Sequence, residues 1–540
     1  MTTLLRVSDL HVTLDTRNGP VDVIHGLSFA IGKGETLGLV GESGSGKSIT
    51  AMSLVGLAPP GTSVRLRGAA QFHGLDLLAL DPRGVRNLRG KRIGVVFQDP
   101  SAALNPLMNA GDHIREALPR GLTRAETNQR IEALLAEVGL GDVPNVRRRY
   151  AHELSGGQQQ RVVIASALAG NPDLLIADEP TTALDMSVQA QILELLASLQ
   201  RARGMAMLLI THDLGVVMRY SNRVVVLRRG HAVEAGPTAS VLGAPSHDYT
   251  RMLLQSRPKL AATAAPSAET DRNDILAVSG LSVSYAGRGP LSPRIHALQS
   301  VDFALRRGDA LAVVGESGSG KSTLGKALVG LVRPDSGSIR FQGSDLHPMK
   351  MTTATRQNIQ YIFQDSYGAL NPRLNVAQAL SEPLSIYGKP RKTWRDEAVR
   401  LLEEVDLGSQ YLQRYPVELS GGQRQRINIA RALAVSPELL ICDEIVSALD
   451  VTVQAQVLEL LSRLRRTRRL SLIFISHDLA VVGALCNRTM VMRNARLVEE
   501  GPTRDILTSP VNLYTRSLVN AARDIADGQS HVRSDMADAV

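Results

Sequence analysis

Two stretches of the chain combine closely spaced glycines with a lysine and a serine, the residue types that bind phosphate groups. Residues 41–48 read GESGSGKS, and residues 315–322 repeat the same letters. Both fit the pattern G-x-x-x-x-G-K-[ST], in which glycines let backbone N–H groups crowd around phosphate oxygens and the dipole of the following helix adds to the attraction. The lysine of this pattern reaches the β- and γ-phosphates, and the serine hydroxyl binds Mg²⁺. The sequence therefore predicts two sites for ATP and Mg²⁺.

The flanks of both loops support this interpretation. Each loop follows an apolar run, ETLGLV or DALAVV, and precedes a helix-like stretch, ITAMSLVGL or TLGKALVGL. A lone match could be an ordinary glycine-rich turn, but the order strand, loop, helix occurs twice. The residues predicted to bind ATP are Gly41, Glu42, Ser43, Gly44, Ser45, Gly46, Lys47, Ser48 and Ile49, with Gly315, Glu316, Ser317, Gly318, Ser319, Gly320, Lys321, Ser322 and Thr323 in the second half.

Two carboxylates follow an apolar, strand-like run in each half of the chain. LLIA leads to Asp178-Glu179, and LLIC leads to Asp443-Glu444. The first carboxylate of each pair is suited to binding Mg²⁺. The second is suited to polarising a water molecule that attacks the γ-phosphate. A lone Asp-Glu pair is more often an ordinary strand end, but the accompanying phosphate loops favour the catalytic interpretation.

Glutamine and histidine residues complete each predicted site. Gln98 and Gln364 lie in the motif FQD and could sense the metal and the γ-phosphate, while His212 and His477 follow apolar runs in THD and SHD. A lone histidine there would usually be a turn residue, but its repetition favours a switch role. The predicted metal ligands are Ser48, Gln98, Asp178, Ser322, Gln364 and Asp443, and the predicted catalytic residues are Glu179, His212, Glu444 and His477.

The second half of the chain repeats the motifs of the first half. The phosphate loops begin 274 residues apart, the FQD motifs 266, and the LSGGQ motifs, acidic pairs and histidines 265. Motifs that recur in one order at a nearly constant offset indicate a tandem repeat. We predict domains at residues 1–256 and 275–523, joined by a flexible linker rich in Ala, Pro, Ser and Thr at 257–274 and followed by a polar, disordered tail at 524–540.

The coarse pattern of each half is that of an α/β fold. The apolar runs before the acidic pair and before the histidine indicate buried parallel strands. The segments NQRIEALLAEVGL and RDEAVRLLEEVDL have the apolar spacing typical of helices. We therefore expect, in each half, a nucleotide-binding core with a helical insertion between FQD and LSGGQ.

The composition argues against several other classes of protein. Of 540 residues, 44% are hydrophobic, and the chain has no run of 18 apolar residues and no signal-like N-terminus, so we expect it to stay inside the cell. Cys442 and Cys486 are too few for a disulfide framework and are expected to be buried. The net charge of +9 is a mild bias, and 3% aromatic residues are a poor supply for stacking on bases, so no nucleic-acid partner is expected.

The stretches ELSGGQQQR at 153–161 and ELSGGQRQR at 418–426 make the pattern specific. Phosphate loop, FQD, LSGGQ, strand-D-E, A-L-D and histidine, in that order, resemble the nucleotide-binding domains of ABC ATPases over almost the whole chain, twice. The resemblance implies two tandem ABC domains, each with a P-loop RecA-like core, an antiparallel β subdomain and a helical subdomain. It also implies that LSGGQ, at a helix N-terminus, contacts the γ-phosphate held by the other domain's loop.

Each ATP would then be held by both domains. Asp185 and Asp450, which end the two A-L-D stretches, would line the seam between them. By resemblance, Lys47 would share its ATP with Ser420, Gly421, Gly422 and Gln423, and Lys321 would share its ATP with Ser155, Gly156, Gly157 and Gln158.

The two halves depart from the family's pattern at two places. The family usually has proline after the catalytic glutamate, as at Pro180, whereas the second half has Ile445, which alters the turn but removes no reacting group. The family also usually has an aromatic residue near the N-terminus that stacks on adenine. Tyr285 fits this role in the second half, but the matching residue of the first half is Leu14.

Two further pairs of stretches resemble the ATPases of the peptide and nickel (dipeptide/oligopeptide) importer family. They are PSAALNPLMN and SYGALNPRLN after FQD, and SHDYTRMLL and VNLYTRSLV after each core. The resemblance implies a fused ATPase subunit, peripheral at the cytoplasmic face of the inner membrane. It would drive alternating access in two transmembrane permease subunits and work with an extracytoplasmic solute-binding protein.

Other functions stay open at this point. The cargo could be nickel or glutathione instead of di- or oligopeptides. A soluble tandem-ABC protein, such as a ribosome-binding translation factor, is the alternative class, although its members resemble one another in a long, charged helical linker that the short stretch at 257–274 does not match.

Overall fold

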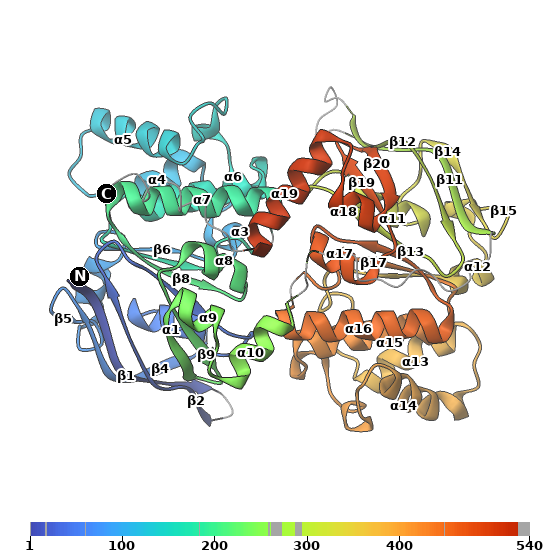
Figure 1. Ribbon diagram of the computed structural model, residues 1–540, viewed down its shortest axis with the longest axis horizontal. Helices are drawn as coiled ribbons and strands as arrows, with labels where there is room; N and C mark the ends of the chain where they lie inside the picture. Colours follow the sequence, from blue (N-terminus) through green and yellow to red (C-terminus); the bar gives the residue numbers. More distant parts are fainter. Residues whose placement is uncertain are drawn as a thin grey trace. The chain divides into compact units, whose positions relative to one another are not determined.

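Residues 2–16, 19–59, 61–182, 184–257, 260, 273–286, 294–447 and 449–527 are described by a computed structural model (Figure 1). They form two compact units, of which the first contains the residues up to 256 and the second contains residues 257–526. Each unit contains a four-stranded and a six-stranded sheet with helices around them. The α/β fold expected of each half is therefore confirmed.

The four-stranded sheet of the first unit is antiparallel, with the strand order β2-β1-β4-β5. The pattern of residues alone did not predict this sheet, which only the family resemblance implied. Its strands are β1 (Thr3–Thr16), β2 (Gly19–Gly32), β4 (Ser63–Phe72) and β5 (Leu75–Asp76).

The six-stranded sheet of the first unit has the order β10-β9-β3-β8-β7-β6, and its pairs are parallel except β9 with β10. Every residue of β3, β7 and β8 is buried, as expected of central parallel strands covered on both faces. The strands are β3 (Thr36–Val40), β6 (Ile93–Val96), β7 (Leu174–Asp178), β8 (Ala206–Thr211), β9 (Arg223–Arg228) and β10 (His231–Pro237).

Helices of the first unit follow the phosphate loop, fill the segment between FQD and LSGGQ, and end the unit. The predicted helix at NQRIEALLAEVGL is α5, which starts with a capping box between Thr123 and Glu126. The helices are α1 (Lys47–Leu54), α2 (Pro82–Leu88), α3 (Pro100–Ala103), α4 (Ala110–Ala117), α5 (Arg124–Glu137), α6 (Gly156–Leu168), α7 (Met186–Arg203), α8 (Leu214–Tyr220), α9 (Thr238–Gly243) and α10 (Asp248–Gln255), with 3-10 turns η1 (Val146–Arg148) and η2 (Ala151–Glu153).

The second unit repeats both sheets. The antiparallel sheet has the order β12-β11-β14-β15, and the other sheet has the order β16-β17-β18-β13-β19-β20. The strands are β11 (Asp274–Tyr285), β12 (Ile295–Arg306), β13 (Ala310–Val314), β14 (Ser336–Phe341), β15 (Ser344–Asp345), β16 (Ile359–Ile362), β17 (Leu439–Asp443), β18 (Ser471–Ile475), β19 (Arg488–Arg493) and β20 (Arg496–Pro502).

The helices of the second unit follow the order of the first, except that the described residues after β16 form a turn where the first unit has α3. The predicted helix at RDEAVRLLEEVDL is α14. The helices are α11 (Lys321–Leu328), α12 (Thr353–Asn358), α13 (Val376–Ile386), α14 (Trp394–Glu404), α15 (Gly421–Leu433), α16 (Val451–Arg468), α17 (Leu479–Leu485), α18 (Thr503–Thr508) and α19 (Leu513–Asp527), with 3-10 turns η3 (Pro348–Lys350), η4 (Arg391–Thr393), η5 (Ser409–Tyr411) and η6 (Pro416–Glu418).

The predicted boundaries can be placed on these elements. Strand β11 begins at Asp274, and most of the predicted linker lies outside the described residues. Helix α19 continues to Asp527, so the first four residues of the predicted tail at 524–540 are helical, and the others lie outside the described residues. Cys442 and Cys486 are free and buried, as expected.

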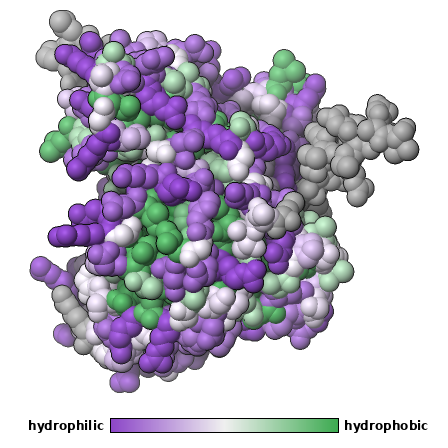
Figure 2. Space-filling model, turned by 90° about the vertical axis from the view of Figure 1, so that its left-hand side faces the viewer, coloured by the Kyte–Doolittle hydropathy of each residue, from purple (hydrophilic) through white to green (hydrophobic). Residues whose placement is uncertain are grey.

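Apolar side chains join the two sheets of each unit. In the first unit, residues of β1 and β2 such as Leu10 and Ile24 form one buried cluster with Leu39 of β3 and Leu54 of α1. In the part of the chain that the structure describes, no helix combines the length and the apolar composition needed to cross a membrane. Figure 2 shows one face on which polar side chains predominate and apolar ones gather near the centre.

Candidate functional site

The two phosphate loops begin where the central strands β3 and β13 end. A Cβ atom on Gly41 would lie 2.1 Å from the carbonyl oxygen of Leu227, and one on Gly315 would lie 2.2 Å from that of Met492. No side chain fits at such a distance, so glycine is required by the close approach of the loop to the end of β9 or β19.

A buried lysine in each loop is hydrogen-bonded to backbone carbonyl groups of the same loop. The Nζ atom of Lys47 donates hydrogen bonds to the carbonyl oxygens of Gly41, at 2.8 Å, and Glu42, at 2.9 Å. Lys321 makes the same two bonds to its own loop, both at 2.8 Å. The ammonium groups thus lie inside the loops, as the predicted role in binding phosphate requires.

Each loop also contains a buried serine whose hydroxyl could bond to a phosphate oxygen. Ser45 and Ser319 are both 4% exposed, and among the described residues their Oγ atoms have no hydrogen-bond partner. A buried hydroxyl without a partner is costly unless a ligand satisfies it. Because these hydroxyls lie in glycine-rich loops at the starts of α1 and α11, the residues present fit phosphate oxygens.

The predicted metal-binding residues meet across long stretches of sequence. The hydroxyl of Ser48 donates to Oδ1 of Asp178 at 3.0 Å, and that of Ser322 donates to Oδ1 of Asp443 at 2.9 Å. Burial raises the pKa of Asp178 to about 6, and a cation bound beside this carboxylate would lower the pKa again. A hydroxyl beside a carboxylate is a donor set that suits Mg²⁺.

The predicted catalytic glutamates lie beside the predicted glutamine of the same unit. The amide Nε2 of Gln98 donates to Oε2 of Glu179 at 2.9 Å, and Gln364 donates to Oε2 of Glu444 at the same distance. The carboxylates are placed by the backbone, because both glutamates have positive φ angles, 45° and 48°, at the turn that follows the strand.

The predicted histidines face the same glutamates. The Nδ1 atom of His212 lies 3.4 Å from Oε1 of Glu179, and that of His477 lies 3.5 Å from Oε2 of Glu444. Burial alone would raise the pKa of Glu179, but the hydrogen bond and charge of His212 outweigh it, so this pKa is lowered. Conversely, burial opposes and Glu179 favours protonation of His212, whose pKa is raised on balance.

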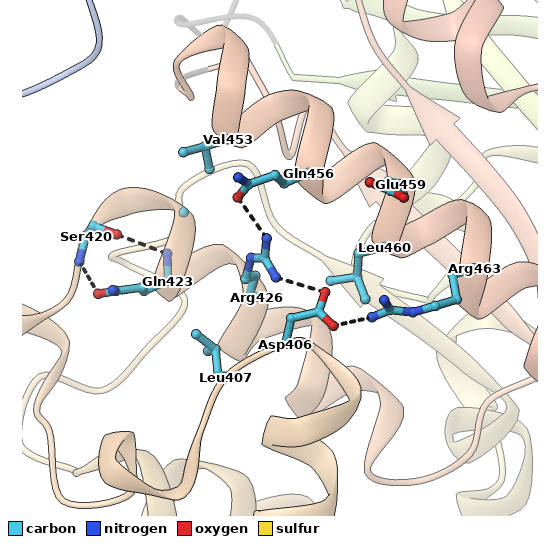
Figure 3. Close-up of a pocket in the computed structure, with 11 residues that line it drawn as sticks. Asp406, Leu407, Ser420, Gln423, Arg426, Val453, Gln456, Glu459, Leu460 and Arg463 are labelled. Atoms are coloured by element: carbon cyan, nitrogen blue, oxygen red, sulfur yellow. Dashed lines mark hydrogen bonds and ion pairs between the residues drawn. The ribbon is translucent and has the colours of Figure 1, made fainter. Parts of the chain in front are cut away.

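The LSGGQ serines start helices α6 and α15 as N-caps. Ser155 Oγ accepts from the backbone N–H of Gln158, and the side chain of Gln158 accepts from the N–H of Ser155. Figure 3 shows the same reciprocal pair between Ser420 and Gln423. Because each hydroxyl accepts in this capping box, its hydrogen stays available to an anion.

In the second unit, polar side chains near the start of α15 form a connected set of hydrogen bonds. Arg426 donates to Gln456 and to Asp406, and Asp406 also accepts from Arg463 (Figure 3). They line a pocket beside Ser420 and Gln423 with a volume of about 560 Å³. The contacts tie α15 to α16 and thereby fix the direction in which the LSGGQ helix start points.

The two glycines of each LSGGQ motif differ in what surrounds them. A Cβ on Gly157 would lie 2.6 Å from Cγ1 of Val188, so this glycine is needed where α6 packs on α7. A Cβ on Gly156 would meet its nearest atom, in Leu184, at an ordinary 3.4 Å. Packing within the unit therefore does not explain the glycine at position 156.

Comparison with known proteins agrees with this geometry. The family model described as ABC transporter matches residues 24–182 and 298–447. The chain belongs to the ABC transporter family. A second model, described as the C-terminal region of oligopeptide/dipeptide transporters, matches residues 233–280 and 498–538.

Relatives of similar length cover almost the whole chain. It is 43% identical to the peptidoglycan transport ATP-binding protein YejF of Agrobacterium fabrum, over 97% of both chains. It is 41% identical to the glutathione import ATP-binding protein GsiA of Pectobacterium atrosepticum, over 96% of this chain and 89% of the relative. This ABC protein is thus a transport ATPase with two ATP-binding cassettes, and its two units have the fold that the family resemblance implied.

Two hydroxyl groups that the sequence analysis missed make the two ABC sites different. In the site of the first unit, the hydroxyl of Thr182 donates to Oε2 of Glu179 at 2.9 Å, whereas the matching Ser447 donates to the backbone carbonyl of Glu444. In the site of the second unit, the hydroxyl of Tyr361 donates to Asp443. Tyr361 belongs to none of the sequence motifs. Alignment of the two halves on FQD would have paired it with Val95 and so shown that only the second half has a hydroxyl there.

The predicted adenine-stacking residue lies beside the second phosphate loop of this ABC protein. The hydroxyl of Tyr285 is 3.4 Å from Oγ1 of Thr323, and its side chain is exposed enough to meet a base. Leu14 at the matching place is half-buried and packs on the core of the first unit. The stacking role of Tyr285 stays a prediction.

Proposed function

We propose that this chain is the energy-coupling ATPase of an importer for peptides or peptide-like solutes. The observation that carries the proposal is that both cassettes hold a full set of reacting groups and that each is followed by a match to the oligopeptide/dipeptide transporter C-terminal region. The names of the relatives, peptidoglycan transport and glutathione import, are compatible with this cargo class.

In each cassette the glutamate is the proposed general base. Glu179 and Glu444 are ionised at neutral pH, since their pKa values are lowered, and each can accept a proton from water. His212 and His477 orient the glutamates, and Gln98 and Gln364 reach the same carboxylates. When bound, Mg²⁺ would be held by Ser48 with Asp178, or by Ser322 with Asp443, and would offset the charge of the phosphates.

The two LSGGQ motifs are proposed to act across the pair of cassettes. Support comes from Gly156 and Gly421, where a Cβ would meet its nearest atom in the same unit at 3.4 and 3.6 Å. Packing within the unit therefore leaves these glycines unexplained, and a phosphate that approaches the helix N-terminus closely would account for them. Lys47 would share its ATP with the motif at Ser420, and Lys321 with the motif at Ser155.

The helical insertions are the proposed contacts with two transmembrane permease subunits. Leu107, in the stretch PSAALNPLMN, is 84% exposed, and Ile386 at the end of α13 is 71% exposed. Ile386 also lines a groove of about 210 Å³ with Phe363, which precedes Gln364. A permease segment in this groove would touch the residues next to the catalytic site, so movement could pass between them. The subunit would then be peripheral, at the cytoplasmic face of the membrane.

The test is reconstitution of the chain with candidate permease subunits and an extracytoplasmic solute-binding protein of the peptide-importer class. ATP hydrolysis in proteoliposomes should rise when the binding protein carries a peptide, and Lys47→Ala with Lys321→Ala should abolish the rise. Stimulation by nickel alone would overturn the peptide assignment. Salt-resistant sedimentation of the isolated chain with ribosomes, without binding to permeases, would instead favour the translation-factor class.

A further inference from the structure

A tyrosine from the segment that follows each cassette core reaches the phosphate loop. Tyr249 of α10 is 2% exposed, and its hydroxyl oxygen accepts a hydrogen bond from the backbone N–H of Glu42 at 3.2 Å. In the second unit, the hydroxyl of Tyr514 of α19 accepts from the N–H of Glu316 at 3.1 Å. Both tyrosines lie in the regions that match the oligopeptide/dipeptide transporter model.

The tyrosine ring lies against the strand that also supports the loop. The guanidinium of Arg228 lies 4.8 Å from the centre of the Tyr249 ring, and that of Arg493 lies 4.5 Å from the centre of the Tyr514 ring. These arginines end β9 and β19 and follow directly on Leu227 and Met492, whose carbonyl groups approach the first glycine of each loop. The loop, the end of the strand and the tyrosine are thus packed against one another.

Different residues fix the tyrosine in the two units. The N–H of Tyr249 donates to Nδ1 of His247, whereas that of Tyr514 donates to Oδ1 of Asn512. The segment before each helix is held by Glu234 in the first unit and by Glu499 in the second. The supports differ, but the bond from tyrosine to loop is the same.

The loop residue that the tyrosine contacts is also one that the lysine contacts. The N–H of Glu42 donates to Tyr249, while its carbonyl oxygen accepts from Nζ of Lys47. Glu316 is held in the same way between Tyr514 and Lys321. We propose that Tyr249 and Tyr514 are positioning residues through which the C-terminal segments set the shape of the phosphate loops and hence the ATP affinity of their own cassettes. This inference rests on the proposed role of the loops in holding ATP.

The test is the affinity for a fluorescent ATP analogue with Mg²⁺ in full-length chains that keep one working loop. In the Lys321→Ala chain, Tyr249→Phe should weaken binding by about fivefold, the loss expected for one hydrogen bond of about 1 kcal/mol. In the Lys47→Ala chain, the same Tyr249→Phe should leave affinity unchanged, because the remaining site depends on Tyr514. Tyr514→Phe should give the opposite pattern.

The design separates positioning from general loss of stability. A fold defect would weaken both sites or lower the melting temperature without a site-specific change in affinity, and it would overturn the proposal. Tyr220→Phe, which removes a hydroxyl elsewhere in the first unit, is the control and should change neither affinity. If the Lys47→Ala and Lys321→Ala chains each bind as tightly as the wild type, the role of the loops themselves fails. If these lysines matter but Tyr249→Phe changes nothing, only the role of the tyrosine fails.

Discussion

The hydroxyl of Tyr361 donates a hydrogen bond of 2.5 Å to Oδ2 of Asp443, whose other oxygen accepts from Ser322 at 2.9 Å. In the first unit Val95 stands two residues before the FQD phenylalanine, where the second unit has Tyr361, and it has no hydroxyl to offer. The two carboxylates that we propose to bind Mg²⁺, Asp178 and Asp443, are therefore held differently. Burial, followed by the nearby charge of Asp443, raises the pKa of Tyr361, so the tyrosine stays a donor at neutral pH.

Tyr361→Phe should weaken the second site in a way that depends on Mg²⁺. Asp443 is 3% exposed and would lose one donor, which costs about 1–2 kcal/mol of unfolding free energy. Because the carboxylate is then less firmly oriented, we expect the half-saturating Mg²⁺ concentration for nucleotide binding to rise several-fold in the Lys47→Ala chain. Tyr387→Phe, at a half-buried tyrosine of the same unit, is the control. Equal Mg²⁺ dependence in both variants would refute this role.

Replacing both proposed bases, Glu179→Gln with Glu444→Gln, should separate binding from hydrolysis. Glutamine keeps the size of the side chain but cannot take a proton from water, so phosphate release should fall by about 10²–10⁴-fold. ATP affinity should stay near that of the wild type, because the loops are untouched. Hydrolysis at the wild-type rate would contradict the assignment of the base.

The pairing of His212 with Glu179 predicts how stability depends on pH. The pKa of His212 is raised in the folded chain, so its contribution to stability is fully present below the unfolded value of about 6.5 and is lost as the pH rises through the folded value. The melting temperature of His212→Gln should therefore differ more from the wild type at pH 6 than at pH 9. His152→Gln, at an exposed histidine, serves as the control. A difference that grows toward pH 9 would show that the sign is wrong.

The LSGGQ glycines offer a test of what is structural and what is functional. Gly156→Ala should change the unfolding free energy by less than about 0.5 kcal/mol, since there is room for a Cβ, yet it should reduce ATP hydrolysis strongly. Gly157→Ala should destabilise the fold by about 1–3 kcal/mol, because its Cβ would clash with Val188. Denaturant unfolding and phosphate release measure the two effects. If Gly156→Ala is destabilising but active, the glycine serves packing alone.

The sequence predicted those features whose cause is local. A phosphate loop needs glycines, a lysine and a hydroxyl within a few residues, so Lys47 and Ser48 could be identified without a fold. The contacts of Tyr361 and Tyr249 could not, because their partners lie 82 and 207 residues away and a tyrosine in a strand or helix usually serves packing. The role of LSGGQ across two cassettes came from family resemblance alone.

The number of labelled ATP molecules retained per chain shows most directly whether each of the two ATP sites is built from both cassettes. In the Glu179→Gln, Glu444→Gln background we expect two ATP molecules per chain. Adding Lys47→Ala with Ser420→Glu removes both partners of one site and should leave one ATP molecule per chain. Adding Lys47→Ala with Ser155→Glu damages both sites and should leave none. The reverse result, one ATP with Ser155→Glu and none with Ser420→Glu, would show that each LSGGQ motif serves its own cassette and that the sites are not shared between cassettes.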